Sequence, residues 1–330
     1  MTRRDALRLA GIGGLSLALT GCGSAGEAPA ASAGGSFPVT LEGAQGSAVL
    51  NAAPARIVSV GLYRDIDAAV ALGLVPLATP DLSGFMEGGI SPWVSRELPG
   101  AKPELLAVTD GLPFEKIAAL APDLILATDH SGLAENYAAL SRIAPTLSTA
   151  SGYNRDPWQV TTTRVGTALG VKSRAETLVS QVEGAILAAK AANPGFAGRT
   201  FTIGPVTAEG VINTVNSPTD ASALFMSQLG LTLSPKVADL PKGNFPGRAT
   251  VSPELIEAID ADVVILTFNT PQARSRLEAN ELFRRIPAVR RGSYIALDLP
   301  TAIAMAFPSA LSIPYGLERS VPRIAAALKA

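Results

Sequence analysis

Cysteine and histidine are almost missing from this sequence, because its 330 residues include one of each. A single cysteine forms no disulfide within the chain and builds no cysteine cluster for zinc or iron–sulfur. A single histidine does not supply a metal site that needs several imidazole ligands. These two shortages exclude disulfide-stabilised folds and most metal centres, and the sequence predicts no cofactor.

Charge is also scarce. The 27 Lys and Arg residues balance 28 Asp and Glu residues, and charged residues make up only 17% of the chain. Such a balance excludes a protein that binds nucleic acid through a strongly basic surface. Hydrophobic residues make up 47% of the chain, which is enough for large buried cores, and the length indicates two domains.

Residues 1–21 are predicted to be a signal peptide. Three arginines within the first eight residues are followed by an uncharged apolar stretch, residues 9–20, that is too short to span a bilayer. The stretch closes with Leu19-Thr20-Gly21-Cys22, which resembles a bacterial lipobox. Cys22 is therefore predicted to carry a lipid and to become the mature N-terminus. The sequence leaves twin-arginine and general export open.

Residues 22–50 are predicted to be a flexible tether. Residues 23–36 contain only Gly, Ser, Ala, Pro and the single charge of Glu27, so they have too little apolar bulk to pack. A lipid on Cys22 is expected to hold the rest of the chain on the outer side of the cytoplasmic membrane.

The remaining sequence predicts an α/β fold of two sheet-and-helix lobes joined by one long rigid helix, with largely parallel sheets. The expected boundaries are 51–170 for the N-terminal lobe, 171–195 for the helix and 196–330 for the C-terminal lobe. The clearest strands are predicted at 56–60, 124–126, 200–203 and 263–266.

The bounds of the long helix and the structure of one uncharged segment are also predicted. The long helix is expected from Ser173 to Ala192, with Ser173 and Glu176 at the spacing of a capping box. Residues 299–317 lack charge, but three prolines interrupt them, so turns and short pieces are expected there instead of a helix.

The chain repeats itself weakly, since residues 115–125 match residues 254–264 in spacing and character. In each copy a glutamate opens a predicted helix and an aspartate, Asp123 or Asp262, precedes a buried strand. The repeat supports a body built from two similar halves.

Several segments in the same order resemble the substrate-binding lipoproteins of ABC importers for iron-siderophores and cobalamin. The segments are Pro54-Ala55-Arg56-Ile57-Val58-Ser59, Pro113-Phe114-Glu115-Lys116-Ile117, Pro122-Asp123-Leu124-Ile125, Ser252-Pro253-Glu254 and Ile286-Pro287-Ala288-Val289. The resemblance implies two lobes bridged by one helix, a cleft between them and little hinge motion. It also implies that Glu115 and Glu254, one in each lobe, dock on arginines of a permease dimer.

The main functional hypothesis is therefore a monomeric receptor that captures a ferric siderophore or similar iron chelate and delivers it to an ABC permease. A haem or cobalamin receptor of the same fold remains an alternative. An exported enzyme is a weaker one, because His130 would have to supply most of the acid–base chemistry and no nucleophile elbow or phosphate loop is present. A zinc or manganese receptor would need more histidines.

Loops that follow predicted strands, and a segment before the long helix, carry the residues predicted to bind ligand: Tyr63, Arg64, His130, Arg155, Phe245, Arg248 and Phe307. Arginines among aromatic rings suit a large anionic chelate, because guanidinium groups pair with carboxylate or catecholate oxygens while rings cover apolar parts. Arg248 is expected to contribute most, with help from Arg64 or Arg155.

Other roles for some of these residues stay open. Arg64 could instead pair with Asp65 or Asp67 at the surface, and a lone His130 could be a hydrogen-bonded structural residue. His130 or Tyr63 could also ligate haem. Next to this set, Tyr153 and Trp158 flank Arg155, and Trp158 is expected to pack the start of a helix.

Overall fold

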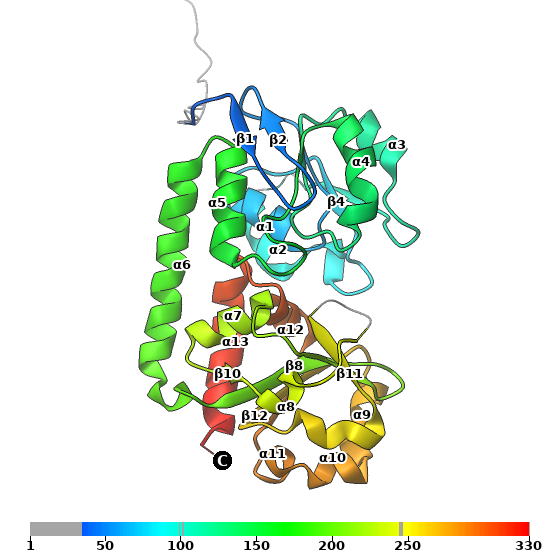
Figure 1. The fold of residues 1–330 in the computed structure, drawn as a ribbon, viewed down its shortest axis with the longest axis vertical. Coiled ribbons are helices and arrows are strands. Elements are labelled where there is room, and N and C mark those ends of the chain that lie inside the picture. Colours follow the sequence, from blue (N-terminus) through cyan, green and yellow to red (C-terminus); the bar gives the residue numbers. More distant parts are fainter. Residues whose placement is uncertain (1–34, 99, 101, 244–246, 330) are drawn as a thin grey trace, which may run out of the picture. The chain divides into compact units, whose positions relative to one another are not determined.

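The computed structural model describes residues 35–98, 100, 102–243 and 247–329, which belong to one compact unit with two lobes (Figure 1). The predicted signal peptide and Cys22 lie outside the described residues. The N-terminal lobe contains a five-stranded sheet in the order β5-β4-β3-β6-β7, and every pair in it is parallel. Its strands are β3 (Ile57–Ser59), β4 (Ala78–Pro80), β5 (Glu104–Leu106), β6 (Leu124–Leu126) and β7 (Thr146–Leu147).

Helices cover this sheet, as a parallel sheet requires. They are α1 (Arg64–Ala71), η1 (Glu87–Gly89), α2 (Pro92–Glu97), α3 (Phe114–Ala119), α4 (Leu133–Ile143) and α5 (Trp158–Ala168). Strands β3 and β6 are buried along their whole length, which explains why β6 is apolar throughout and why β3 departs from apolar residues only at Ser59.

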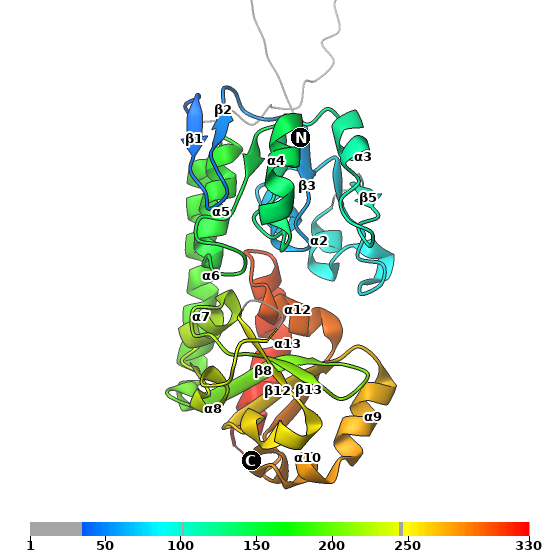
Figure 2. The same cartoon turned by 45° about the vertical axis from the view of Figure 1, so that its right-hand side comes forward.

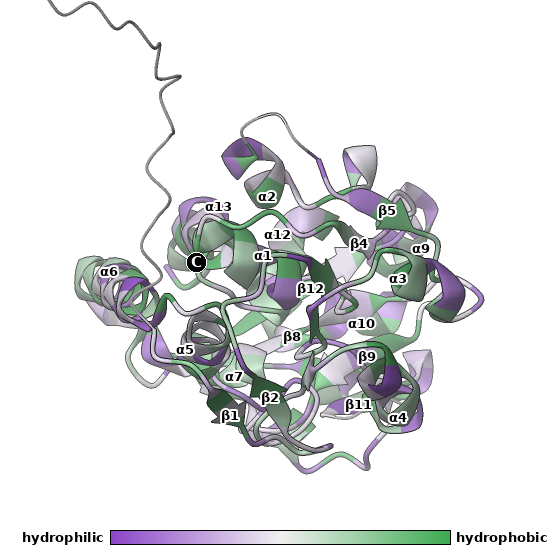
Figure 3. Ribbon diagram, turned by 90° about the horizontal axis from the view of Figure 1, so that it is seen from above, coloured by the Kyte–Doolittle hydropathy of each residue, from purple (hydrophilic) through white to green (hydrophobic). Residues whose placement is uncertain are grey.

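The tether predicted for residues 22–50 extends too far. Strands β1 (Val39–Leu41) and β2 (Ala48–Leu50) form an antiparallel hairpin, which Figure 3 colours hydrophobic. Ala48 and Leu50 are buried in the core of the N-terminal lobe, and Phe37 packs against the same core. The apolar residues that begin at Phe37 therefore bring this segment into the folded lobe.

Helix α6 (Lys172–Ala192) runs along both lobes (Figure 2) and agrees with the predicted bridge. Its Ala175 packs into the core of the N-terminal lobe, whereas Val182 and Ile186 pack into the core of the C-terminal lobe. The predicted capping box is wrong. The N-cap is Val171, and no side chain caps the helix.

The C-terminal lobe follows the short turn η2 (Pro194–Phe196) and has a mixed sheet in the order β11-β9-β8-β12-β13, with β10 also paired to β8. The pairs β8–β10, β8–β12 and β12–β13 are parallel. Strand β9 pairs antiparallel with both of its neighbours, β8 and β11. The strands are β8 (Thr200–Val206), β9 (Ile212–Val215), β10 (Thr232–Leu233), β11 (Arg248–Val251), β12 (Val263–Phe268) and β13 (Tyr294–Leu297).

The helices of this lobe include two where only turns were expected. They are α7 (Ala221–Gln228), α8 (Pro235–Ala238), η3 (Pro253–Ile259), α9 (Pro271–Ala279), α10 (Glu281–Arg285), α11 (Pro287–Arg290), α12 (Leu299–Ala306) and α13 (Ser312–Ala327). Pro300 and Pro314 lie in the first turns of α12 and α13. A first-turn N–H has no partner within the helix, so proline is tolerated there.

The predicted repeat has a structural counterpart. Asp123 accepts hydrogen bonds from the backbone N–H groups of Ala55 and Arg56, just before β3. Asp262 accepts one from the backbone N–H of Thr200, at the start of β8. In each lobe an aspartate therefore joins the starts of two neighbouring parallel strands.

The lobes are joined by more than α6. Tyr63 and Trp93 of the N-terminal lobe share a buried apolar cluster with Ile303 of α12 and Tyr315 of α13. Within this cluster the Asp67 carboxylate accepts hydrogen bonds from Trp93 Nε1 at 2.8 Å and Ser309 Oγ at 2.5 Å. Among the described residues, no helix has the length and hydropathy needed to cross a bilayer.

Candidate functional site

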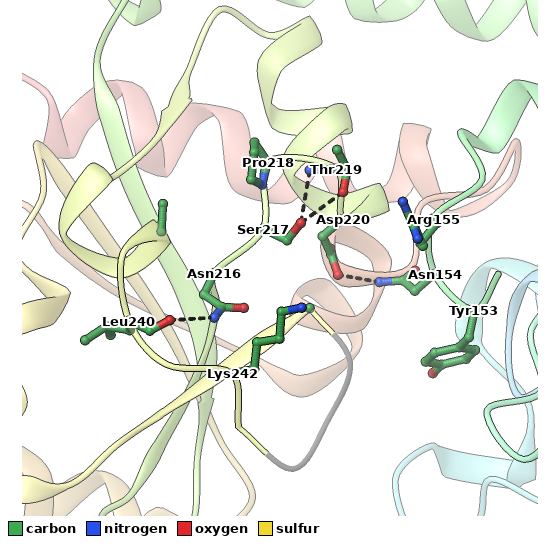
Figure 4. Close-up of a pocket in the computed structure, with 12 residues that line it drawn as sticks. Tyr153, Asn154, Arg155, Asn216, Ser217, Pro218, Thr219, Asp220, Leu240 and Lys242 are labelled. Atoms are coloured by element: carbon green, nitrogen blue, oxygen red, sulfur yellow. Dashed lines mark hydrogen bonds between the residues drawn. The ribbon is translucent and has the colours of Figure 1, made fainter. Parts of the chain in front are cut away.

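A pocket of about 470 Å³ lies between the lobes (Figure 4). One wall comes from the loop that leads into α5 of the N-terminal lobe, and the other comes from loops that follow β9 and α8. The lining residues are Tyr153, Asn154, Arg155, Asn216, Ser217, Pro218, Thr219, Asp220, Ala238, Leu240, Lys242 and Gly247. Amide, hydroxyl and cationic groups therefore surround one aromatic ring, an arrangement suited to binding a polar organic molecule.

Asp220 organises this pocket. Its carboxylate accepts a hydrogen bond from the backbone N–H of Ser222 and so caps α7. The same carboxylate accepts bonds from Arg248 Nη1 at 2.6 Å and from Asn154 Nδ2 at 2.9 Å. Because Asn154 belongs to the N-terminal lobe, Asp220 connects the two walls.

Two backbone positions make this arrangement possible. Asn154 has a φ of 52°, a left-handed conformation that asparagine tolerates better than most residues. Gly247 has a φ of 71°, and a Cβ there would lie 2.9 Å from the Asp220 carboxylate. A side chain at residue 247 would therefore disturb the carboxylate that joins the walls.

A second buried ion pair lies in the N-terminal lobe. The Arg64 guanidinium donates two hydrogen bonds to Asp129 Oδ1, and both side chains are 1% exposed. Asp129 also accepts bonds from the backbone N–H groups of Tyr63 and Arg64 at the start of α1. The alternative in which Arg64 pairs with Asp65 or Asp67 at the surface is therefore wrong.

Of three other ionisable groups near this pair, Asp65 and Asp67 are buried and Tyr153 is partly buried. Burial raises the pKa of Asp65 and of Asp67 to about 7, although hydrogen bonds from Thr128 and Ser309 oppose the rise. Burial and the charge of Asp129 raise the pKa of Tyr153, so its phenol stays protonated at neutral pH. Tyr153 therefore offers the pocket a hydroxyl.

The predicted ligand residues separate into groups. Arg155 lines the pocket and is exposed. Arg248 is paired with Asp220, whose residue also lines the pocket. Tyr63 and Phe307 pack against each other with ring centroids 4.9 Å apart, in the apolar cluster between the lobes. Phe245 lies outside the described residues.

His130 is half-buried and lies 2.9 Å from Asn136 Nδ2 through its Nε2 atom. Burial lowers its pKa, which favours the neutral ring. Trp158 is buried at the start of α5, as expected, and it also packs into the core of the C-terminal lobe. In the described part of the chain, no group of three or more Cys, His, Asp or Glu side chains is arranged to hold a metal ion.

Glu115 and Glu254 are both exposed in the first turns of their helices, α3 and η3. A hydrogen bond from the Ser252 hydroxyl lowers the pKa of Glu254. Both carboxylates are therefore accessible to a partner.

Sequence reasoning did not select Asn154, Asn216, Asp220 or Lys242. Asn216 directly follows β9, and Asp220 stands four residues later at the start of α7. A polar loop after a strand was the signal that would have found them.

A two-lobed α/β fold with a polar pocket between the lobes defines a solute-binding protein. The sequence matches the periplasmic binding protein family over residues 89–300, and the chain belongs to that family. This result confirms the family and fold predicted from the sequence.

Several solved structures are similar. A periplasmic solute binding protein from Mycobacterium smegmatis is 33% identical, with 88% of this chain and 98% of that chain covered and a TM-score of 0.76. PiaA from Streptococcus pneumoniae, solved in complex with ferrichrome, is 25% identical, with the same coverage and a TM-score of 0.76. SirA from Staphylococcus aureus, solved with staphyloferrin B, is 20% identical, covers 88% and 98%, has a TM-score of 0.69 and shows the fold alone. No curated protein matches this sequence.

Proposed function

We propose that this protein is the substrate-binding component of an ABC importer, that it captures a ferric siderophore, and that it acts as a monomer without catalysing a reaction. The observation that carries the proposal is the inter-lobe pocket, where Tyr153, Arg155 and Lys242 surround a cavity of about 470 Å³. The similar PiaA structure, which contains ferrichrome, supports an iron chelate as the ligand.

The charges of the pocket favour a chelate that presents oxygen atoms. Arg155 and Lys242 form no ion pair within the described residues, whereas Arg248 is neutralised by Asp220. The two unpaired cations attract hydroxamate, catecholate or carboxylate oxygens, and the Tyr153 ring covers an apolar part of the ligand.

A fluorescence titration tests this function. The purified protein is titrated with ferric hydroxamate, catecholate and citrate chelates, with haem and with cobalamin, while quenching of tyrosine and tryptophan emission is followed. We expect saturable quenching by at least one ferric siderophore at micromolar concentration or below. Quenching by haem or cobalamin alone would assign one of those ligands, and no quenching by any compound would refute the receptor function.

Delivery and anchoring complete the proposal. Glu115 and Glu254 lie one in each lobe and would contact two equivalent basic sites on a permease dimer. Cys22 would hold the receptor near that permease through a lipid on its thiol. Mass spectrometry of the membrane-bound protein tests the anchor, and an unmodified Cys22 would refute it.

A further inference from the structure

The outer end of the C-terminal lobe carries a concentration of positive charge. Residues 271–291 hold six arginines and two glutamates, so this segment has a net charge of +4, whereas the whole chain has a net charge of -1. The segment contains α9, α10 and α11, and all six arginines are exposed. The arginine surface consists of Arg274, Arg276, Arg284, Arg285, Arg290 and Arg291.

The three helices of this segment form one continuous surface. Helix α10 packs against both α9 and α11, and it also packs against η3, which carries Glu254 in its first turn. Figure 1 shows α9, α10 and α11 next to one another at the outer end of the lobe. The arginine surface therefore adjoins the glutamate that we propose to contact the permease.

The acids of the segment neutralise only two of its arginines. Glu278 pairs with Arg274 at 2.7 Å, and Glu281 pairs with Arg285 at 3.6 Å. In the part of the chain that the structure describes, the other four arginines form no ion pair. The arginine surface therefore keeps an excess of positive charge.

Two aspartates lie beside α11, in a surface hollow that Arg291 also lines. Both already pair with other cations, in the ion pairs Lys236–Asp260 and Arg199–Asp262. These aspartates therefore cancel little of the charge on the arginines.

Backbone carbonyls orient unpaired guanidinium groups without neutralising them. Arg276 Nη1 donates to the Ala208 carbonyl at 2.7 Å, and Arg291 Nη2 donates to the Ala261 carbonyl at 3.0 Å. Glu209 also lies near Arg276, but it is exposed, so water and salt screen the attraction. Each guanidinium has five N–H groups, and those that stay free can bind phosphate oxygens in pairs.

The middle helix of the surface also exposes an apolar side chain, because Leu282 of α10 is 37% exposed. Arginines combined with an exposed leucine are typical of helices on a membrane surface, where cations bind lipid headgroups and the apolar side chain enters the boundary below them. A soluble anion would leave Leu282 in water. The combination therefore favours a membrane as the partner.

We propose that the arginine surface is a membrane contact, in which its guanidinium groups bind the phosphates of anionic phospholipids and Leu282 enters the headgroup boundary. The inference rests on the proposed function and adds an orientation to it. The C-terminal lobe of the anchored receptor lies against the membrane that holds the permease, and Glu254 stays close to its proposed contact.

Vesicle sedimentation tests the contact without a permease or a chelate. The protein used begins at residue 22 and carries Cys22→Ala, so it keeps the whole compact unit and has no acyl chain. We expect it to sediment with vesicles of phosphatidylcholine mixed with phosphatidylglycerol, and not with vesicles of phosphatidylcholine alone. Raising the salt from about 0.1 M to about 1 M shortens the screening length from about 10 Å to about 3 Å and should release the protein.

Variants locate the effect. Arg285→Gln/Arg290→Gln removes two cations whose side chains donate no hydrogen bond to the backbone of the described residues, so folding should be unaffected. Each arginine lost near an anionic membrane weakens binding about fivefold, so this double variant should bind about 25-fold more weakly. Arg142→Gln/Arg174→Gln is the matched control, because it removes two exposed arginines from α4 and α6, and it should bind like the wild-type protein.

Two further measurements identify the source of the phosphate. Leu282→Ser keeps every charge and should weaken vesicle binding several-fold, because an apolar contact is lost. Inorganic phosphate should release no more protein from the vesicles than sodium chloride at the same ionic strength. Release by phosphate alone would assign a site for free phosphate and refute the membrane contact.

The outcomes separate this inference from the proposed function. If the wild-type protein binds neutral and anionic vesicles alike, or binds neither, the membrane contact is refuted and the chelate titration still decides the receptor function. If Arg285→Gln/Arg290→Gln binds like the wild-type protein, or the control loses binding equally, the arginine surface is not the contact. A protein that binds anionic vesicles but no chelate keeps the membrane contact and loses the proposed function.

Discussion

At the scale of single residues, two buried carboxylates determine what the arginines of this protein can do. Asp129 neutralises Arg64, and Asp220 neutralises Arg248. Both arginines were expected to attract an anionic ligand, but a paired guanidinium exerts little net attraction. The exposed Arg155 stays the arginine that we propose to attract the ligand, and Arg248 instead pairs with Asp220 in the wall of the pocket.

Arg155→Ala and Arg248→Ala should therefore differ in a thermal unfolding and ligand titration experiment. Arg155→Ala should weaken chelate binding several-fold and leave the Tm unchanged, because Arg155 is exposed. Arg248→Ala leaves the Asp220 carboxylate buried and unpaired, which should lower the free energy of unfolding by about 3 kcal/mol. Arg248→Lys keeps the charge and should lose less. An Arg248→Ala protein with an unchanged Tm would contradict the structural role of this ion pair.

At the scale of elements, helix α6 sets the spacing between the lobes. Its hydrophobic residues pack into one core and then into the other, and α5 packs against its first half. Gly166 of α5 makes that approach close, since a Cβ there would lie 2.3 Å from Ala175 Cβ. Gly184 of α6 faces open space instead.

These two glycines predict opposite effects of the same substitution. Gly184→Ala should stabilise the protein by about 0.5–1 kcal/mol, because alanine in a helix interior loses less entropy on folding than glycine does. Gly166→Ala should destabilise it, since α5 and α6 must move apart to admit the new methyl group. Urea denaturation of both variants measures the difference. Equal effects would show that α5 and α6 do not pack as closely as described.

At the scale of the whole molecule, several sets of contacts join the lobes. They include α6, the buried cluster that contains Trp93, the packing of Trp158 in the core of the C-terminal lobe, and the bond from Asn154 to Asp220. Contacts of this kind are expected to restrict rotation of one lobe against the other, in line with the small hinge motion that the family resemblance implies. We therefore expect Glu115 and Glu254 to stay at a nearly constant separation, which the proposed two-point contact with a permease dimer would require.

The double variant Glu115→Ala/Glu254→Ala should bind chelate and unfold like the wild-type protein, because both side chains are exposed. Uptake of the iron chelate by cells should fall to a small fraction of the wild-type rate, since the charges that we propose to contact the permease are gone. Normal uptake would remove the docking role, and so would loss of chelate binding.

Glu135→Ala/Glu281→Ala is the matched control for this experiment. Glu135 and Glu281 are also exposed first-turn helix acids, one in each lobe. This control should transport normally. A similar fall in uptake would show that lost surface charge, and not a specific contact, is responsible.

Local patterns were sufficient for most of the fold. Runs such as residues 124–126 and 263–266 are buried on both faces of their sheets, so their sequence is apolar throughout and identifies them as strands. The long helix was equally clear from its period. Its capping box was not real, because a Ser–Glu spacing does not reveal where tertiary packing starts a helix.

The sequence by itself determined the α/β class, the two halves with their paired aspartates, and the helix that bridges them, because these depend on neighbours along the chain. Only the tertiary structure decided the site. Arg64 meets Asp129 from 65 residues away, and Asn154 meets Asp220 from 66 residues away. Arginine near aromatic residues looks the same in a sequence whether it is free for a ligand or neutralised by a distant carboxylate, because the folded chain chooses the partner.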